Sequence, residues 1–271
     1  MDLGLQGRVA AVTGGSHGVG YAITEALLAE GCRVAICARD KARLDAAARS
    51  LEQAGPEARR PDNTAAAQRA ADGVFAHPAD VGKPGEVEDF VQATASHFGG
   101  LDILVHNAGG GSGAGLESPD AEFGQAIELN VMASLRAARV AVPLMRKRGR
   151  GRIIFISSIY GRESGGRAGY NVAKAAEISL AKALSRELAK DKILVNTVAP
   201  GSLMFPGSSW ERRQQADPEI IEAFTKSDLP LGRFGKPEEV AAVVTFLASD
   251  RASLVTGACW TVDGGQSRSL I

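Results

Sequence analysis

The sequence predicts an α/β protein: a doubly wound, seven-stranded parallel sheet with helices on both faces, in a single domain. Three features of the 271 residues carry this prediction. Short apolar runs alternate with longer segments of helical periodicity. The runs are largely hydrophobic throughout, as expected for strands buried on both faces. The first run leads through a glycine-rich turn into a helical segment. Such alternation is typical of parallel sheets with right-handed crossovers.

The expected strands are short and rich in Val, Ile, Leu and Ala, beginning with the run RVAAVT. An apolar run of this length, bounded by turn residues, predicts a strand inside the sheet. In chain order, strands are expected at residues 8–13, 33–38, 73–77, 101–106, 152–157, 193–199 and 258–262.

The expected helices place apolar residues three and four positions apart. In the first, Val19, Ile23, Ala26 and Leu27 share one face, and Gly31 ends the helix. In chain order, helices are expected at residues 18–30, 40–54, 83–98, 120–145, 168–190 and 237–249.

Two segments interrupt this alternation without dividing the chain, so residues 1–271 are expected to form one nucleotide-binding domain. Residues 55–72 are polar and alanine-rich and predict a surface insertion, in part helical. Residues 201–235 form a long connection that contains Trp and Phe side chains. A connection of this length is usually a functional loop or else disordered, and the aromatic residues favour a substrate-binding lid.

Composition excludes several classes of protein. Lys and Arg number 31, as do Asp and Glu, so the basic surplus of a nucleic-acid-binding protein is missing. The cysteines Cys32, Cys37 and Cys259 are too few and too scattered for a disulfide framework or a zinc site, so no metal is expected. No apolar run is long enough for a membrane span or resembles a signal peptide, which predicts a cytoplasmic protein that does not bind membranes.

A glycine-rich turn, Thr-Gly-Gly-Ser-His-Gly-Val-Gly at residues 13–20, joins the first strand to the first helix. Glycines allow a sharp turn and close approach to a pyrophosphate, which the N–H groups at the helix start can bind. A glycine-rich turn without a ligand is the alternative, but the position at the first strand of a βαβ unit favours a dinucleotide. The candidate phosphate-binding residues are Gly14, Ser16, His17, Gly18, Val19 and Gly20.

From this turn onward the chain resembles the short-chain dehydrogenase/reductase family, whose members have a Rossmann-type fold. Further motifs follow in the family's order across nearly the whole chain. They are Asn107-Ala108-Gly109, Asn130, Ser158, Tyr170-Asn171-Val172-Ala173-Lys174, Pro200-Gly201 and Val262-Asp263-Gly264-Gly265. Each motif is weak alone, but the ordered set is specific. The resemblance implies a nicotinamide cofactor and a homotetramer with two-fold axes.

The resemblance also bears on the choice of cofactor. Relatives that prefer NAD carry an acidic residue where Ala38 stands, whereas Arg39 follows here and can offer its guanidinium to a 2′-phosphate. His17 stands where NADP-using relatives often carry a basic side chain. NADP(H) is therefore the expected cofactor, with NAD(H) possible. The alternative is that Arg39 is merely solvated and Asp40 turns to the ribose, although an aspartate at a helix start usually caps the helix.

Further cofactor contacts are implied by the resemblance. Asp80 and Val81 match the pair that contacts the adenine, although Asp80 could also cap the next helix. The backbone of Leu203 would meet the nicotinamide carboxamide, since the threonine that many relatives carry nearby is missing. The other residues expected along the cofactor are Asn107, Ala108, Gly109, Tyr170, Lys174, Pro200 and Gly201.

Tyr170 and Lys174 are four residues apart, so both lie on one face of their helix. Reduction of a carbonyl needs a proton donor beside the forming alkoxide. A free phenol ionises only near pH ~10, and a neighbouring ammonium favours the phenolate form. The resemblance implies that Lys174 also binds the nicotinamide ribose, that Ser158 holds the substrate oxygen, and that Asn130 positions a water in a proton relay.

Two adjacent serines compete for this role. Ser158 precedes the short turn to Gly161 that relatives show, and only one of two successive residues in a strand can face the cleft. Ser158 is therefore preferred to Ser157. Tyr160 has no lysine four residues later, which makes it a wall of the substrate pocket rather than an acid.

The expected function is NADPH-dependent hydride transfer between nicotinamide and a carbonyl or secondary alcohol of a small molecule, with Tyr170 as acid and base. A 3-oxoacyl-acyl-carrier-protein reductase is the commonest activity for such sequences. An alcohol or sugar dehydrogenase of the same family is one alternative. A non-catalytic, NADP(H)-sensing binding protein on the same fold is another.

Overall fold

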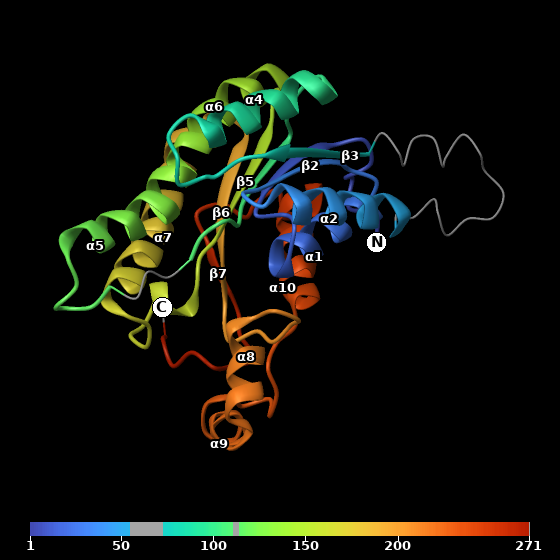
Figure 1. Ribbon diagram of the computed structural model, residues 1–271. Coiled ribbons are helices and arrows are strands. Elements are labelled where there is room, and N and C mark those ends of the chain that lie inside the picture. Colours follow the sequence, from blue (N-terminus) through green and yellow to red (C-terminus); the bar gives the residue numbers. More distant parts are fainter. Residues whose placement is uncertain (55–72, 111–113, 271) are drawn as a thin grey trace.

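A computed structural model describes residues 1–54, 73–110 and 114–270. Within them, seven strands form one parallel sheet in the order β3-β2-β1-β4-β5-β6-β7, which confirms the predicted fold (Figure 1). Because β1 lies between β2 and β4, the direction of winding reverses there, and doubly wound sheets bind ligands at that point. The strands are β1 Val9–Thr13, β2 Arg33–Ala38, β3 Val74–Pro78, β4 Ile103–His106, β5 Gly151–Ile156, β6 Ile193–Pro200 and β7 Cys259–Val262.

Helices cover both faces of the sheet. α1, α2 and α10 pack on one face, and α4, α6 and α7 pack on the other (Figure 1). α8 and α9 lie apart from these two layers, near one end of the sheet. The helices are α1 Gly18–Ala29, α2 Lys41–Ala54, α4 Glu86–Phe98, α5 Asp120–Ile127, α6 Ala133–Arg148, α7 Ala168–Leu188, α8 Ser209–Ala216, α9 Pro218–Asp228 and α10 Pro237–Ala248.

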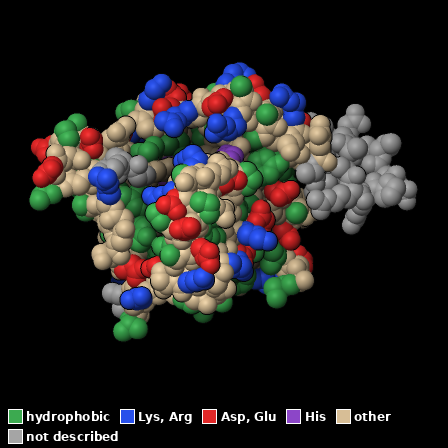
Figure 2. Space-filling model, turned by 60° about the horizontal axis from the view of Figure 1, so that its bottom comes forward, with side chains coloured by type: hydrophobic (Ala, Val, Ile, Leu, Met, Phe, Trp, Pro, Cys, Tyr) green, Lys and Arg blue, Asp and Glu red, His purple; other side chains and the backbone are tan. Residues whose placement is uncertain are grey.

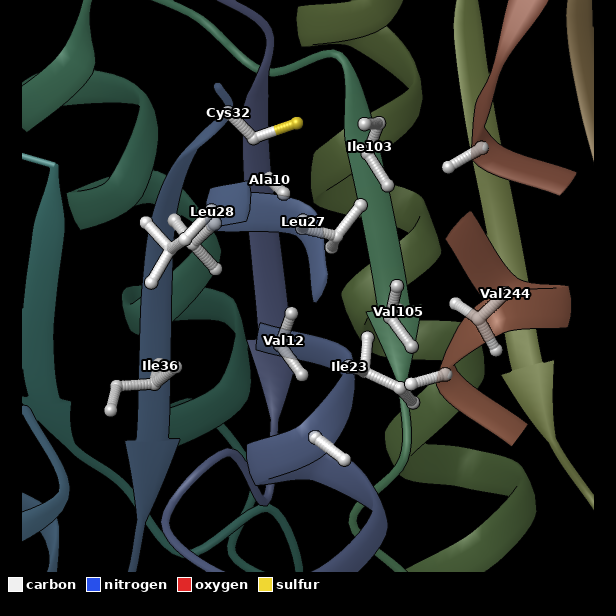
Figure 3. Close-up of a cluster of buried hydrophobic side chains, with 14 of the residues drawn as sticks. Ala10, Val12, Ile23, Leu27, Leu28, Cys32, Ile36, Ile103, Val105 and Val244 are labelled. Carbon is white, nitrogen blue, oxygen red and sulfur yellow. The ribbon is translucent and has the colours of Figure 1, made fainter. Parts of the chain in front are cut away.

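The core consists of two apolar layers separated by the sheet. Alternate residues of β1 contribute to opposite layers, as the pleat requires: Val12 packs toward α1 and α10, and Ala11 toward α4 and α6. Figure 3 shows Ile23 and Leu27 of α1 between the strands and Val244 of α10. Burial of each such side chain stabilises the fold by about 1.5–3 kcal/mol. This packing holds β1 rigidly against the helix that begins at the glycine-rich turn.

The helix expected at 120–145 is interrupted. α5 passes into a π-helical turn, Glu128–Met132, before α6 begins. The buried side chain of Asn130 lies in this turn, and its Nδ2 donates to the backbone oxygen of Ala126, four residues earlier, at 2.8 Å. That oxygen would otherwise accept the regular helical bond, so the side chain provides a local reason for the wider turn. The deviation occurs at a predicted site residue.

Residues 201–235 contain two helices, α8 and α9, that the sequence analysis did not predict. Each begins at a capping residue: Ser208 Oγ accepts from Glu211 N at 3.0 Å, and Asp217 Oδ1 accepts from Ile220 N at 3.1 Å. A parallel bridge between Leu203 and Gly235 joins the two ends of the segment. We call residues 203–235 the helical lobe.

The start of α4 differs from the predicted helix boundary. α4 begins at Glu86 rather than at residue 83, because residues 80–83 form a turn in which Lys83 N donates to Asp80 O at 2.9 Å. The insertion expected at residues 55–72 lies outside the described residues. In the described part of the chain, no helix is both long and apolar enough to cross a bilayer.

Candidate active site

The glycine-rich turn has the backbone geometry that a phosphate-binding loop requires. Gly14 and Gly18 have φ values of +68° and +56°, a region that favours glycine. A Cβ atom at Gly20 would overlap the Gly14 carbonyl oxygen, so the helix can start this close to the strand only with glycine. Within the described part of the chain, no side chain caps the start of α1. Its first N–H groups and the positive end of the helix dipole therefore favour a phosphate.

Thr13 and Asn107 join the ends of β1 and β4 beside this turn. Thr13 Oγ1 accepts from the backbone N–H groups of Asn107 at 3.0 Å and Ala108 at 2.9 Å. In return, Asn107 Nδ2 donates to the Thr13 carbonyl at 3.0 Å. Asn107 therefore braces the centre of the sheet. The sequence analysis assigned no role to Thr13, and its position immediately before the glycines was the available signal.

A cleft of about 440 Å³ opens at this edge of the sheet. Its walls contain eight of the residues predicted to contact the cofactor: Gly14, Ser16, Arg39, Asp80, Val81, Asn107, Ala108 and Gly109. Asp80 Oδ1 accepts from Gly82 N at 3.1 Å, so its carboxylate shapes the turn after β3 instead of capping α4. The cleft lies at the reversal of strand order and fits a dinucleotide in position and lining.

Two arginines stand at one end of the cleft. Arg39, which precedes α2, was predicted to contact the cofactor. Arg43, in the first turn of α2, was not predicted. Both side chains are exposed, and among the described residues neither guanidinium has a hydrogen-bond or ion-pair partner. Asp40 does not turn to the cleft as a ribose ligand would, because its Oδ1 caps α2 by accepting from Arg43 N at 3.0 Å. This contact favours the predicted role of Arg39 over the alternative.

Not every predicted cofactor residue lines this cleft. The His17 ring packs against the Phe205 ring, with centroids 5.4 Å apart, so it contacts the helical lobe. Val19 packs partly against the core. Gly201 N donates to Val262 O at 3.1 Å, and Leu203 lines a separate small cavity under the lobe. Gly18 and Gly20 lie in the α1 helix, and Pro200 ends β6.

Four polar groups converge beyond the other end of the cleft. A Cβ atom at Gly109 would lie 2.6 Å from Asn130 Oδ1 and 3.2 Å from Lys174 Nζ, so Gly109 sits directly against both side chains. Lys174 Nζ lies 5.9 Å from the centre of the Tyr170 ring. Ser158 is the second residue after β5, and Lys174 Nζ donates to the last carbonyl of that strand, Ile156 O, at 2.9 Å. Asn130, Tyr170 and Lys174 therefore lie together, and Ser158 lies near them through the end of β5 that Lys174 contacts.

The two serines make different contacts. Ser157 Oγ donates to the Lys174 backbone oxygen at 2.9 Å and so uses its proton to attach β5 to α7. Ser158 Oγ accepts from Tyr160 N at 3.2 Å, which leaves its own proton available for a ligand. This difference supports the choice of Ser158, since a substrate oxygen requires a donor.

Charge at this site is strongly shaped by burial. Burial alone would lower the pKa of the Lys174 ammonium, but the carboxylate of Glu177 and the interaction with Tyr170 outweigh burial and raise that pKa. Behind it, burial and the positive charge of Lys174 lower the pKa of His106 to about 3. His106 is therefore neutral and packs against Thr13, with Nδ1 3.3 Å from Oγ1.

A second cavity, of about 450 Å³, adjoins the tyrosines. A Cβ atom at Gly166 would lie 3.1 Å from the Tyr160 ring and 3.2 Å from the Tyr170 ring, so the two rings flank the same point. Tyr160 therefore lines a cavity, and its role as a wall of the substrate pocket stays a prediction. The cavity lining is mostly polar and consists of Tyr160, Arg162, Glu163, Ser164, Gly165, Phe224, Asp228, Gln266, Arg268 and Ser269.

The C-terminal segment forms part of this cavity through one carboxylate. Glu163 Oε2 accepts from Ser267 Oγ at 2.9 Å, from Arg268 N at 2.8 Å and from Ser269 N at 3.1 Å. Arg162 Nη1 donates to Cys259 O at 3.1 Å. No local sequence pattern indicates that residues about 100 positions later would contact these two loop charges.

The aromatic residues of the helical lobe mainly pack against one another. Trp210 stacks on Phe224 with centroids 4.5 Å apart, and Phe234 lies 5.1 Å from Trp210. The aromatic residues therefore pack the segment itself, and the substrate-binding lid stays a prediction. Phe224 in addition lines the cavity beside Tyr160.

This arrangement defines a nicotinamide-dependent oxidoreductase that acts on hydroxyl or carbonyl groups: a dinucleotide cleft meets a tyrosine–lysine pair with a free serine donor. A family model described as enoyl-(acyl carrier protein) reductase matches residues 14–267. Together with the relatives below, it shows that the chain belongs to the short-chain dehydrogenase/reductase family. Within the described residues, no group of three or more His, Cys, Asp or Glu side chains could hold a metal ion.

Two relatives and one solved structure illustrate the range of the family. The chain is 37% identical over 268 residues to a rhamnolipid-biosynthesis 3-oxoacyl-[acyl-carrier-protein] reductase of Pseudomonas aeruginosa, covering 96% of each chain. It is 35% identical to the 2,3-dihydroxy-2,3-dihydro-p-cumate dehydrogenase of Pseudomonas putida, covering 98% of this chain and 96% of the relative. L-Sorbose reductase of Gluconobacter frateurii, solved with NADPH and L-sorbose, superposes with a TM-score of 0.88 at 36% identity over 100% of both chains.

Proposed function

We propose that this protein is an NADPH-dependent reductase of a small, polar ketone, acting reversibly on the corresponding secondary alcohol. The observation that carries the proposal is the convergence of Asn130, Ser158, Tyr170 and Lys174 between the dinucleotide cleft and the polar cavity. A carbonyl group placed between the two would meet a hydroxyl donor and a phenol together. NADP(H) is the cofactor that the arginines favour.

The residues have distinct tasks in this proposal. Tyr170 donates its phenolic proton to the carbonyl oxygen, and Ser158 donates a hydrogen bond to the same oxygen as negative charge develops on it. Lys174 binds the cofactor ribose and favours the phenolate that remains. Asn130 holds a water that links Lys174 to solvent, so that a proton from solvent is relayed back to Tyr170. The nicotinamide, when bound, supplies the hydride.

The preference for NADP(H) rests on Arg39 and Arg43. Arg39→Ala is expected to lower kcat/KM for NADPH roughly 10- to 100-fold, because a charged hydrogen bond contributes about 1.5–3 kcal/mol. The value for NADH should change little, and adding Arg43→Ala should increase the loss. Arg49→Ala, at an exposed position on the same helix, is the matched control. A wild-type preference for NADH, or an equal loss with both cofactors, would exclude the assignment.

The substrate class rests on the cavity beside Tyr160. Eight of its ten lining residues carry polar or charged side chains, a lining suited to a hydroxylated substrate more than to a long acyl chain. Figure 2, which views the molecule with the helical lobe brought forward, shows acidic and basic side chains interspersed on this face. That face has no broad basic patch to steer a large anionic partner.

We expect hydroxylated ketones, with L-sorbose as the first compound, to be reduced with a higher kcat/KM than 3-oxoacyl thioesters. A panel of both classes, followed by loss of NADPH absorbance, measures this directly. Faster reduction of the thioesters would restore the 3-oxoacyl reductase as the leading function. Tight NADPH binding without turnover of any compound would instead favour the cofactor-sensing binding protein. The structure describes a single chain, so the homotetramer stays a prediction.

A further inference from the structure

A buried ion pair lies directly behind the proposed reaction centre. Lys174 Nζ donates to Glu177 Oε2 at 3.0 Å, with side-chain exposures of 5% and 0%. Both residues project from α7, three positions apart. Buried ion pairs seldom stabilise a fold more than an apolar pair of similar volume does. The presence of a carboxylate here therefore calls for an explanation other than stability.

The ion pair fixes the orientation of the Lys174 ammonium group. An ammonium group has three N–H donors, and two of them are used by Glu177 Oε2 and Ile156 O. Nζ also lies against Gly109, at 3.2 Å from the position of a Cβ atom there, and Gly109 lines the cofactor cleft. The hydrogen bonds to Glu177 and Ile156 thus leave one N–H donor of Lys174 for the cofactor cleft.

The pair also controls the charge of the lysine. The other titratable groups around the pair come from several elements. Tyr170 of α7 acts on Lys174, Lys174 acts on His106 of β4, and Glu177 acts on Cys259 of β7, beside which Arg162 lies. His106 is neutral, and burial raises the pKa of the Cys259 thiol. Burial also raises the pKa of Glu177 itself to about 7, so its carboxylate is charged above neutral pH.

We infer that Glu177 is a positioning residue of the reaction centre: its carboxylate keeps Lys174 charged and aims the remaining N–H donor at the cofactor cleft. The inference rests on the proposed function, in which Lys174 binds the ribose of the cofactor. The sequence analysis missed Glu177. A single acidic residue on the buried face of a helix, three positions after the lysine, was the available signal.

The inference predicts the direction of a pH effect. The pKa of Lys174 is raised in the folded protein, so its ammonium is present at lower pH and is lost as the pH rises through that pKa. Glu177→Gln removes the carboxylate that raises this pKa and leaves the effect of burial, which lowers it. Functions of the ammonium should therefore fail at a lower pH in the variant than in the wild type.

The test is the dissociation constant of NADPH, followed by nucleotide fluorescence across pH in the wild type, Glu177→Gln and Glu177→Leu. We expect the alkaline loss of affinity to move down by at least about one pH unit in both variants, since a charge at this distance shifts a pKa by about 1–3 units. The alkaline limit of kcat should move with it. Glu187→Gln, which removes an exposed carboxylate from the same helix, should leave both curves in place.

Other outcomes overturn the inference. If affinity falls by one constant factor at all pH values and the alkaline limit stays in place, Glu177 is only structural. Removing one partner of a buried ion pair destabilises a fold. Glu177→Leu, whose side chain has no polar atom left to satisfy, therefore provides the measurement if Glu177→Gln fails to fold. A wild type that binds NADPH but reduces no ketone refutes the proposed function. The pH dependence of NADPH binding can still be measured in that case and still tests the role of Glu177. A wild type that binds no NADPH refutes both.

Discussion

Tyr170→Phe is expected to lower kcat for ketone reduction by roughly 10³-fold or more, while NADPH binding changes little. The substitution removes one oxygen, and with it both the proton donor and a hydrogen bond to the developing oxyanion. The ring keeps its place beside Lys174, whose Nζ lies 5.9 Å from the ring centre. Loss of NADPH absorbance measures kcat, and nucleotide fluorescence measures binding.

Tyr21→Phe is the matched control for this variant. It removes the same atom from an α1 tyrosine whose hydroxyl lies 2.9 Å from Ser50 Oγ, on the opposite helical layer from α7. Its kcat should equal that of the wild type. If Tyr170→Phe keeps near-full activity, the proton comes from elsewhere and the proposed mechanism is wrong.

Ser158→Ala is expected to lower kcat about 10²- to 10³-fold, the usual effect of removing one donor to an oxyanion. Its hydroxyl proton is uncommitted among the described residues, because Ser158 Oγ only accepts, from Tyr160 N. The loss should appear in kcat with NADPH binding intact. Steady-state kinetics of the preferred ketone, together with an NADPH titration, separates these two effects.

Ser157→Ala provides the contrast from the neighbouring position. Its hydroxyl donates to the Lys174 carbonyl, so the variant should lose about 1 kcal/mol of stability and keep most of its kcat. Thermal unfolding and the same kinetic assay measure both quantities. Inactive Ser157→Ala with active Ser158→Ala would place the substrate oxygen at the other serine.

The elements with strong local signals were predictable. Apolar runs located the strands to within about two residues, since continuous hydrophobicity is specific to strands in a buried parallel sheet. Ser208 and Asp217 mark the starts of α8 and α9. These helices were not predicted, because the segment was interpreted as a loop from its length. The π-helical turn at Asn130 has no periodic signature, since it depends on where one side-chain amide bonds.

In the candidate site, too, residues with a local sequence signal could be predicted and residues without one could not. Tyr170, Lys174 and the glycines could be identified because their roles depend on short, fixed spacings along the chain. Arg43, the bond of Glu163 to residues 267–269 and the burial of Glu177 depend on which elements pack side by side. Spacing along one strand or helix specifies which residues share a face. It does not specify which distant side chain that face will contact. In this protein such long-range contacts form part of the cofactor cleft, of the substrate cavity and of the surroundings of Lys174.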